Sequence, residues 1–541
     1  METKVGVFFC NCGGAIKNID FDAALREVAR LPGVISVNLD SSLCLEEGKE
    51  RMVSSIRDEK MERVVVAGCS PLLKEHIFQG ILEKAGLNKH LLSMANIREQ
   101  CSWVHDGDVT AKAVDLVRMA INRVLLLQPV ETKETAVSKE VLVAGSGFAA
   151  LNVALQLSHL GLRTTVMEEG PVLRAGSEEP AAVYGVDASS IIAEVEANEN
   201  VEVLTSARVI TLEGKVGGFG VRIKKAGKET FRRYGAIVLA TGHRTEIVNP
   251  GAEAGASVVS QKAFTDILRN SSLEREPRTV GFILDFSDEN SRFPTLATLN
   301  SALAAKKKWG SEIYVFYKSV KVDSEGVERL YQQARDSGVV FVKSETAPKI
   351  GVEDGRVKVE GRDVFAGEDL VLACDVLVAE ELYLPAEGTE TFSSLLNVRT
   401  DPKGFWQDDN VHLYPVGSEK KGIFFVGGCR GDLDPGRMLA DISGVAMNIG
   451  ELLSAGKVAA DFERVKADPQ KCVACLTCIR VCPHGAIQLV RVESSKDVAQ
   501  ISDLACDACG VCAAVCPAKA IAFQGCSDEE ILAQIEAIKR S

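Results

Sequence analysis

The sequence predicts a multidomain α/β protein. Three features lead to this prediction: strands and helices alternate over residues 1–127, a glycine-rich strand–turn–helix unit begins at Glu140, and two matching cysteine runs occupy residues 472–483 and 506–517. A chain of 541 residues is too long for one hydrophobic core, so we expect several domains.

The N-terminal part of the chain alternates four expected strands with four expected helices. The strands are VGVFF, VISVNLD, RVVVAG and LLSMAN, and the helices lie near residues 20–30, 46–58 and 75–86 and in a long segment that ends near residue 127. This order is typical of an open α/β sheet, and we assign it residues 1–130.

Cysteines follow each of these four strands. They are Cys10, Cys12, Cys44, Cys69 and Cys101. Parallel strands bring their carboxyl ends to one edge, where open α/β sheets bind ligands. Four of these five thiols could bind a 4Fe-4S cluster, with one thiol not used as a ligand. It would be a third cluster, in addition to the two expected at the C-terminal end of the chain. The alternative is a set of reduced thiols without a metal.

The unit that begins at Glu140 reads EVLVAGSGFAALNVALQLSHLG and has the pattern of a dinucleotide-binding turn. Gly145 permits the tight turn, Gly147 lets the backbone approach a pyrophosphate, and the small Ala150 lets the helix pack on the sheet. The phosphates would bind at the helix N-terminus. The next strand ends at Glu168, whose carboxylate can accept hydrogen bonds from an adenosine ribose.

Two later segments favour FAD over NAD as the dinucleotide. They are AIVLATGH, which contains Thr241 and Gly242, and GIFFVGGCRGD, which contains Gly427 and Gly428. Both resemble signatures of two-dinucleotide-domain flavoproteins of the thioredoxin-reductase class, and the resemblance spans about residues 138–455. It implies a first FAD-binding part, a Rossmann-like insert and a second FAD-binding part, at residues 138–250, 251–365 and 366–455.

The insert has expected strands at TVGFILD, EIYVFY and VVFVKSE but lacks a phosphate loop. After the first strand come Phe286 and Ser287, no glycine, and two acids, Asp288 and Glu289, which would repel a pyrophosphate. NAD(P)H binding is therefore disfavoured there. The insert also lacks a CxxC pair, which excludes thioredoxin-reductase chemistry. The lone Cys374 is expected to be a buried apolar residue.

The two C-terminal cysteine runs read CVACLTCIRVCP and CDACGVCAAVCP, which is the Cx2Cx2Cx3CP pattern of two-cluster bacterial ferredoxins. In that pattern the fourth cysteine of each run ligates the cluster of the other run. One 4Fe-4S cluster is expected on Cys472, Cys475, Cys478 and Cys516, and the other on Cys506, Cys509, Cys512 and Cys482. The alternative of two zinc sites is disfavoured by the crossing cysteines. We place this domain at residues 460–526 and expect a capped helix in SDEEILAQIEAIKR.

Composition bounds the class of protein. Nine of the 16 cysteines follow residue 471, a clustering that fits metal binding better than a disulfide scaffold. The net charge of −13 argues against nucleic-acid binding. The start METKVGVFFC lacks the pattern of a signal peptide, and no apolar run is long enough for a transmembrane segment, so we expect a cytoplasmic protein.

The motifs GVFFCNCGG, AGCSP and NIREQCSWVH, together with the glycine-rich unit and the cysteine runs, resemble the A subunit of heterodisulfide reductase over nearly the whole chain. The resemblance implies an oxidoreductase subunit of a larger anaerobic complex, which passes electrons between FAD, 4Fe-4S clusters and partner subunits. The implied partners are the B and C subunits of that reductase, ferredoxin, and a further hydrogenase-like or dehydrogenase-like protein, in an oligomeric assembly. This chain is expected to be a reduced member, because KVGGFGVRIKKAGKETFRRYG stands where the family often inserts a second ferredoxin domain.

Three alternatives compete with an electron-transfer subunit. The first is a stand-alone NAD(P)H-dependent oxidoreductase resembling the small subunit of glutamate synthase, and the second is an electron-bifurcating flavoprotein. The third is an assembly scaffold whose clusters only stabilise the fold. No Ser/His/Asp arrangement or pair of acids stands in a convincing context, so no catalytic residue is nominated.

Overall fold

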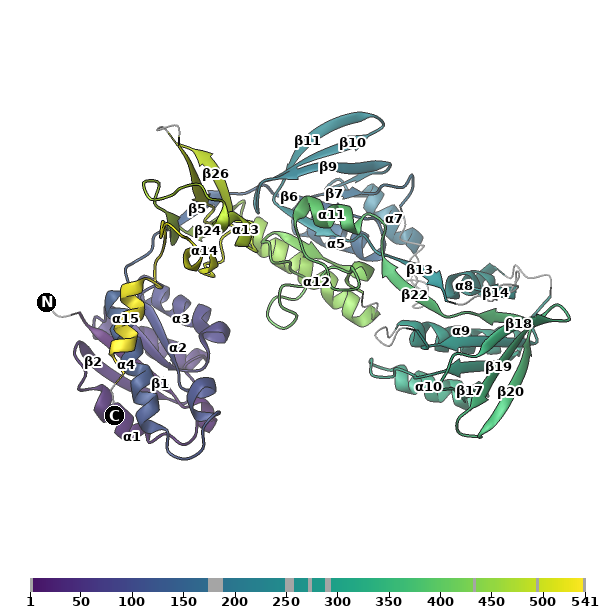
Figure 1. Ribbon diagram of the computed structural model, residues 1–541, viewed down its shortest axis with the longest axis horizontal. Coiled ribbons are helices and arrows are strands. Elements are labelled where there is room, and N and C mark those ends of the chain that lie inside the picture. Colours follow the sequence, from purple (N-terminus) through teal and green to yellow (C-terminus); the bar gives the residue numbers. More distant parts are fainter. Residues whose placement is uncertain are drawn as a thin grey trace. The chain divides into compact units, whose positions relative to one another are not determined.

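The computed structural model describes residues 3–173, 188–248, 257–270, 275–287, 293–431, 434–492 and 496–538. The chain forms two compact units (Figure 1). The first unit combines residues 1–134 with 459–541, and the second comprises residues 135–458. Among the described residues, no helix is long and apolar enough to cross a membrane.

The N-terminal region is a sheet of four parallel strands in the order β2-β1-β3-β4. Its strands and helices are β1 Val5–Cys10, α1 Phe21–Val28, β2 Val34–Asp40, α2 Glu46–Asp58, β3 Arg63–Gly68, α3 Pro71–Ala85, β4 Leu92–Asn96 and α4 Thr110–Leu126. The side chains of Val5, Val7 and Phe9 pack with α1 and α4, whereas Phe8 and Cys10 pack with α2 and α3. Helices thus cover both faces of the sheet, and the predicted order of elements is confirmed.

The C-terminal cysteine runs form two similar halves. Strand β25 Val465–Ala467 pairs with β28 Ile521–Phe523, and β26 Ile487–Arg491 pairs with β27 Asp497–Ile501, both antiparallel. Each run contains a short helix, α13 Thr477–Val481 or α14 Val511–Ala514. The matching positions Leu476 and Gly510 precede these helices with φ angles of 66° and 79°. The internal repeat therefore extends to the backbone conformation.

Helix α15 Asp528–Glu536 follows the second half and packs against α4 (Figure 1). Ser527 and Glu530 form the reciprocal capping box that stabilises its first turn, so the predicted capped helix is confirmed. On α4, Arg123 Nη2 donates a hydrogen bond to the carbonyl of Gly525 at 2.7 Å. Helix α15 and the segment before it are therefore attached to α4 of the N-terminal region within this unit.

A second attachment lies at the end of β24 Lys457–Asp461, a strand that pairs with β5 Thr132–Ala136. The Asp461 carboxylate is 2.7 Å from Lys89 Nζ and 2.8 Å from His90 Nε2. Burial by itself would raise the pKa of Asp461, but the close contacts with His90 and Lys89 outweigh it and hold that pKa far below its usual value.

Replacing Asp461 should therefore destabilise the first unit in a pH-dependent way. We expect Asp461→Asn to reduce the free energy of unfolding by about 1–3 kcal/mol at neutral pH. A lowered carboxyl pKa stabilises the fold above the unfolded value of about 4, and that stabilisation is lost as the pH falls below it. Thermal unfolding followed from pH 7 downward should show wild type and variant converging in acid.

The matched control is Asp497→Asn, which removes an exposed ion pair with Arg491 on the same domain. Its unfolding midpoint should stay close to that of the wild type, because exposed pairs contribute little. Equal midpoints for Asp461→Asn and wild type at pH 7 would show that this attachment does not stabilise the unit.

The second unit is built on a sheet of five parallel strands in the order β23-β12-β6-β7-β8. These strands are β6 Glu140–Ala144, β7 Arg163–Met167, β8 Val201–Leu204, β12 Ala236–Leu239 and β23 Ile423–Phe425. The accompanying elements are α5 Phe148–His159, α7 Ala188–Ala197, α11 Thr389–Leu396, α12 Pro435–Leu453 and the antiparallel strands β9 Ala207–Glu213, β10 Phe219–Lys225 and β11 Lys228–Tyr234. From the central β6 the chain runs to β7 on one side and later returns to β12 on the other. Open α/β sheets bind ligands where the strand order reverses in this way.

The insert has its own parallel sheet in the order β14-β21-β15-β16-β17 and an antiparallel sheet in the order β18-β19-β20. The strands are β14 Val258–Val259, β15 Thr279–Leu284, β16 Glu312–Tyr317, β17 Val340–Lys343, β18 Lys349–Glu353, β19 Arg356–Asp363, β20 Glu368–Cys374 and β21 Val376–Val378. Its helices are α8 Gln261–Asn270, α9 Phe293–Trp309 and α10 Val327–Asp336, and β13 His243–Ile247 pairs with β22 Glu381–Pro385. The three predicted strands are confirmed, and Cys374 is fully buried in the apolar core, as expected.

Candidate functional site

The turn after β6 holds the first predicted cofactor residues. Gly145 has a φ of 120°, and a Cβ at this position would lie 2.0 Å from the carbonyl oxygen of Ala240. Gly147 is the N-cap of α5 and, because it has no side chain, cannot form a side-chain capping hydrogen bond. Ala150 is completely buried. The N-terminus of α5 thus offers backbone N–H groups and a positive dipole end, which is what a pyrophosphate requires.

Glu168 lies directly after β7, with a side chain that is almost fully buried. One carboxylate oxygen accepts a hydrogen bond from Ser146 Oγ at 2.6 Å, and the other accepts from the backbone N–H of Gly170 at 2.7 Å. These two hydrogen bonds fix the orientation of the Glu168 carboxylate at the end of β7.

The other two flavin segments lie beside this turn. Thr241 follows β12, and its Oγ1 accepts a hydrogen bond from the indole of Trp406 at 3.4 Å. A Cβ at Gly427 would lie 2.9 Å from Ala149 Cβ on α5, so the third segment packs directly on α5. Gly242 and Gly427 have positive φ angles of 74° and 81°.

A buried ion-pair network holds the third segment in place. Gly428 lies in the turn η5 Gly427–Arg430, and Arg430 pairs with both Asp408 and Asp441, the latter on α12. The neighbouring Cys429 is 2% exposed and its Sγ bonds to the carbonyl oxygens of Leu239 and Val426 at 3.2 and 3.1 Å. These contacts give Cys429 a packing role in the described structure.

In the insert, the Glu380 side chain accepts hydrogen bonds from the backbone N–H groups after β15, which are the groups that a second dinucleotide would need. Glu380 follows β21, and its carboxylate accepts hydrogen bonds from the N–H groups of Phe286 and Ser287 at 2.8 and 2.7 Å, and from Ser287 Oγ at 3.1 Å. The adjoining cavity is also lined by Asp285 and Glu381. Negative charge at this strand edge opposes a pyrophosphate. The predicted repelling acids Asp288 and Glu289 lie outside the described residues.

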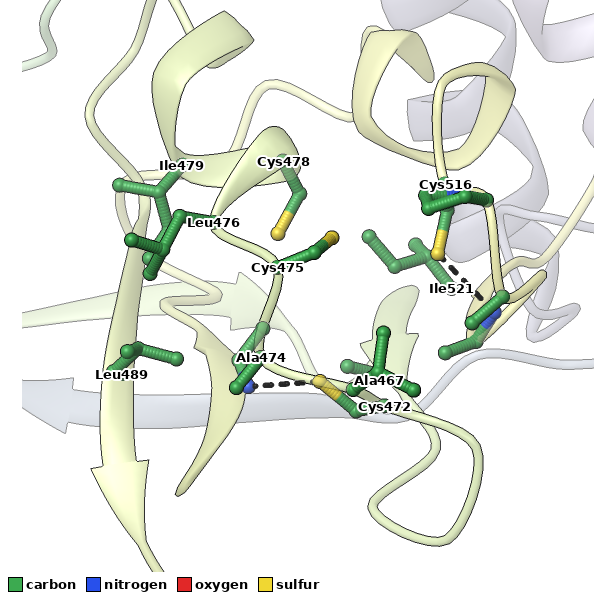
Figure 2. Close-up of a pocket in the computed structure, with 15 residues that line it drawn as sticks. Ala467, Cys472, Ala474, Cys475, Leu476, Cys478, Ile479, Leu489, Cys516 and Ile521 are labelled. Carbon is green, nitrogen blue, oxygen red and sulfur yellow. Dashed lines mark hydrogen bonds between the residues drawn. The ribbon is translucent and has the colours of Figure 1, made fainter. Parts of the chain in front are cut away.

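The first predicted cysteine quartet lines one pocket of the C-terminal module. Figure 2 shows Cys472, Cys475 and Cys478 from the first run, with Cys516 of the second run across the same space. Apolar side chains such as Ile479, Leu489 and Ile521 complete the wall.

The second quartet lines a separate pocket. Cys506, Cys509 and Cys512 of the second run meet Cys482 of the first run there. Burial raises the pKa of Cys512 to about 11, and the neighbouring Cys506, Cys482 and Cys509 add to the rise. Both predicted sets of crossing cysteines are therefore brought together by the fold.

Backbone N–H groups point at cysteine sulfurs in both quartets. Ala499 donates to Cys472 at 3.5 Å, Ala520 to Cys516 and Ala508 to Cys506 at 3.3 Å, and Ala486 to Cys482 at 3.4 Å. Such donors stabilise thiolate charge and are typical of cluster sites. Within the described ranges, no three His, Cys, Asp or Glu side chains are grouped as a single metal ion requires. A four-iron cluster instead binds each thiolate to a different iron, so its thiolates need not converge on one point.

Among the N-terminal cysteines, Cys10 interacts electrostatically with Cys12, Cys44 and Cys69. Burial raises the pKa of Cys10; backbone hydrogen bonds from Leu43 and Cys12 oppose this rise, and the charges of Cys12 and Cys44 add to it. Burial also raises the pKa of Cys69, and Cys10 contributes to that rise. By contrast, Cys101 is fully buried in the core formed with α1 and α4, and its Sγ lies 3.8 Å from the carbonyl of Val109.

The segment NIREQCSW attaches to the loop that carries Cys12. Arg98 Nη1 donates to Cys12 Sγ at 3.0 Å, Ser102 Oγ donates to the carbonyl of Lys17 at 2.6 Å, and Trp103 Nε1 donates to the carbonyl of Ala15 at 2.9 Å. These three hydrogen bonds hold the loop that carries Cys12 against the segment NIREQCSW.

Four residues near these sites were not identified from the sequence: Arg98, Glu380, Trp406 and His484. Arg98 contacts Cys12, and His484 lines the second C-terminal pocket, 3.6 Å from Asp507. The sequence does mark His484, because it replaces a small residue in the repeat: the matching position after the other crossing cysteine is Ala518. Arg98 stands in the quoted motif NIREQCSWVH, but its contact with Cys12 joins distant segments and was not predicted. Glu380 and Trp406 also touch residues far along the chain, and no local pattern marks them.

Comparison with protein families places two known domains on the chain. Residues 139–279 match the family described as pyridine nucleotide-disulphide oxidoreductase, and residues 471–520 match the family described as 4Fe-4S dicluster domain. Among solved structures, a thioredoxin reductase from T. acidophilum covers 58% of this chain and 99% of its own at 14% identity, with a TM-score of 0.39. The family matches confirm the predicted fold class and the oxidoreductase class.

Curated relatives match over nearly the whole chain. The A subunit of the Ferredoxin/F(420)H(2)-dependent CoB-CoM heterodisulfide reductase of Methanosarcina acetivorans is 27% identical, over 90% of this chain and 75% of the relative. The first of two iron-sulfur A subunits of the CoB–CoM heterodisulfide reductase of Methanopyrus kandleri is also 27% identical, over 99% of this chain and 98% of the relative. The latter alignment spans 661 positions against a chain of 541 residues, so that relative has segments that this chain lacks.

Proposed function

From a chain that is related over nearly its whole length to the A subunits of heterodisulfide reductase, we propose an FAD-containing and iron–sulfur-containing electron-transfer subunit of a larger complex. The observation that carries the proposal is the pair of crossing cysteine quartets, each gathered around its own pocket. Two clusters in one small domain serve the passage of electrons to and from partner proteins. The proposed partners are the B and C subunits of such a reductase, ferredoxin, and a further hydrogenase-like or dehydrogenase-like protein.

The flavin would be held by the turn after β6 and the two segments beside it. The α5 N-terminus would bind the pyrophosphate, Glu168 would orient the adenosine ribose, and Thr241 and the Gly427 turn would line the remaining cofactor. When bound, FAD supplies the exchange between two-electron and one-electron transfer. The chain's own residues bind and orient it, and no side chain is assigned as a catalytic acid or base.

The position of Glu380 separates this proposal from a stand-alone NAD(P)H oxidoreductase. Its carboxylate occupies the donors at the end of β15, so we expect NADH and NADPH to leave the flavin of the isolated chain oxidised over minutes. A low-potential one-electron donor such as reduced ferredoxin should reduce it. Anaerobic absorbance spectra measure both reactions, and fast, saturable reduction by NADH would favour the stand-alone enzyme instead.

A third 4Fe-4S cluster in the N-terminal region is proposed on Cys10, Cys12, Cys44 and Cys69. Cys10 interacts electrostatically with each of the other three thiols, whereas Cys101 lies in the apolar core. The prediction is that Cys69→Ser lowers the iron content by one cluster, and Cys101→Ser leaves it unchanged. Iron and sulfide analysis with low-temperature paramagnetic resonance of reduced protein checks this, and the reverse pattern would put Cys101 among the ligands.

A further inference from the structure

The strongest unexplained feature is a charged pair beside the N-terminal cysteines. Arg98 and Glu99 open η2 Arg98–Ser102, the π-helix that follows β4. Arg98 Nη1 donates to Cys12 Sγ at 3.0 Å, while its Nε and Nη2 donate to Glu99 Oε1 at 3.0 and 2.6 Å. One guanidinium therefore joins a cysteine sulfur to a carboxylate.

The geometry of this pair is fixed by its surroundings. The guanidinium lies over the Trp103 ring, 4.7 Å from the centroid, and the Arg98 side chain is only 15% exposed. The backbone N–H of Glu99 donates to Asn96 Oδ1 at 2.9 Å. The second carboxylate oxygen of Glu99 is buried without a hydrogen-bond partner in the described structure. The Glu99 side chain is 27% exposed, and a partly buried charge acts more strongly on its neighbours than one in bulk water.

We propose that Arg98 and Glu99 set the reduction potential of the N-terminal cluster in opposite directions, Arg98 raising it and Glu99 lowering it. The inference rests on the cluster proposed above. A cluster with thiolate ligands becomes more negative when it accepts an electron. The Arg98 guanidinium stays protonated and donates to a ligand sulfur, so it stabilises the reduced state. Glu99 opposes this by neutralising part of the guanidinium charge.

The contact with Arg98 also supports the backbone of the loop that carries Cys12. The Cys12 loop has backbone φ angles of 54°, 63° and 85° at Cys12, Gly13 and Gly14, a left-handed turn that needs external support. A lysine would supply the charge from a single nitrogen, whereas the arginine fork presents separate N–H groups to Cys12 and Glu99 in one fixed plane. Arg98 is therefore a positioning residue as well as an electrostatic one.

The test is a redox titration of the full chain, with the N-terminal cluster followed by its paramagnetic resonance signal. That signal is identified as the one that Cys69→Ser removes. Arg98→Gln should shift its midpoint potential downward, Glu99→Gln should shift it upward, and Arg98→Lys should fall between Arg98→Gln and wild type. Arg26→Gln removes an exposed charge from α1 in the same region and should leave the potential unchanged, because solvent screens it.

Opposite shifts of the two glutamine variants, with iron content retained, support the proposal. A merely structural pair would give shifts of the same sign or none, and either result overturns it. If Arg98→Gln loses the cluster, the midpoint potentials of Glu99→Gln and Arg98→Lys still test the proposal, because the first should be higher and the second lower than that of the wild type. If Cys69→Ser removes no signal from the wild type, the N-terminal cluster itself is absent, which overturns this inference through the cluster assignment and leaves the C-terminal clusters untouched.

Discussion

Gly145→Ala should abolish FAD binding and destabilise the second unit. The substituted Cβ would stand 2.0 Å from the carbonyl oxygen of Ala240, an overlap with backbone that no rotamer can relieve. The residue also has a φ of 120°, which a residue with a Cβ adopts only at a cost. The steric overlap and the strained φ angle together should reduce the free energy of FAD binding by about 3 kcal/mol or more, which corresponds to about 100-fold weaker binding or worse.

Flavin content after purification and the midpoint of thermal unfolding measure this effect. The matched control is Gly218→Ala in the same unit, where a Cβ meets no atom within 4 Å and the φ angle is not positive. It should retain flavin at the wild-type ratio. Full flavin content in Gly145→Ala would mean that the turn after β6 does not bear the cofactor.

Cys516→Ser should remove the cluster of the first cysteine run, although Cys516 belongs to the second. The structure places Cys516 in the pocket with Cys472, Cys475 and Cys478 (Figure 2). A four-iron cluster that loses a thiolate from an apolar pocket loses a charged ligand that water replaces poorly. We expect iron to fall by one cluster, and electron transfer through this domain to fall to background.

The identity of the lost cluster is the sharper measurement. The paramagnetic resonance spectrum of reduced Cys516→Ser should match that of Cys475→Ser and differ from that of Cys509→Ser. Cys526→Ser replaces an exposed thiol that lines neither pocket and should keep both signals. A match between Cys516→Ser and Cys509→Ser would show that each run binds its own cluster with all four cysteines.

Much of the fold could be predicted because its signals are local. The strands and helices of the N-terminal region follow the apolar period, and the capping box at Ser527 and Glu530 is three residues wide. The Cx2Cx2Cx3CP spacing confines three thiolates to one loop and sends the fourth away, so the membership of both C-terminal quartets followed from spacing. The steric need for glycine at Gly145 was equally visible, because it serves one tight turn.

The remaining features depend on contacts between distant segments. Which N-terminal cysteines gather depends on the π-helix after β4, which turns Cys101 toward the α1 and α4 core and Arg98 toward Cys12, 86 positions away. Likewise, Glu380 reaches the N–H of Phe286 across 94 positions, because β21 and β15 are neighbours in the insert sheet. Spacing along the chain was enough for ligands that share a loop, whereas side-chain direction and strand order exist only in the folded chain and therefore needed the tertiary structure.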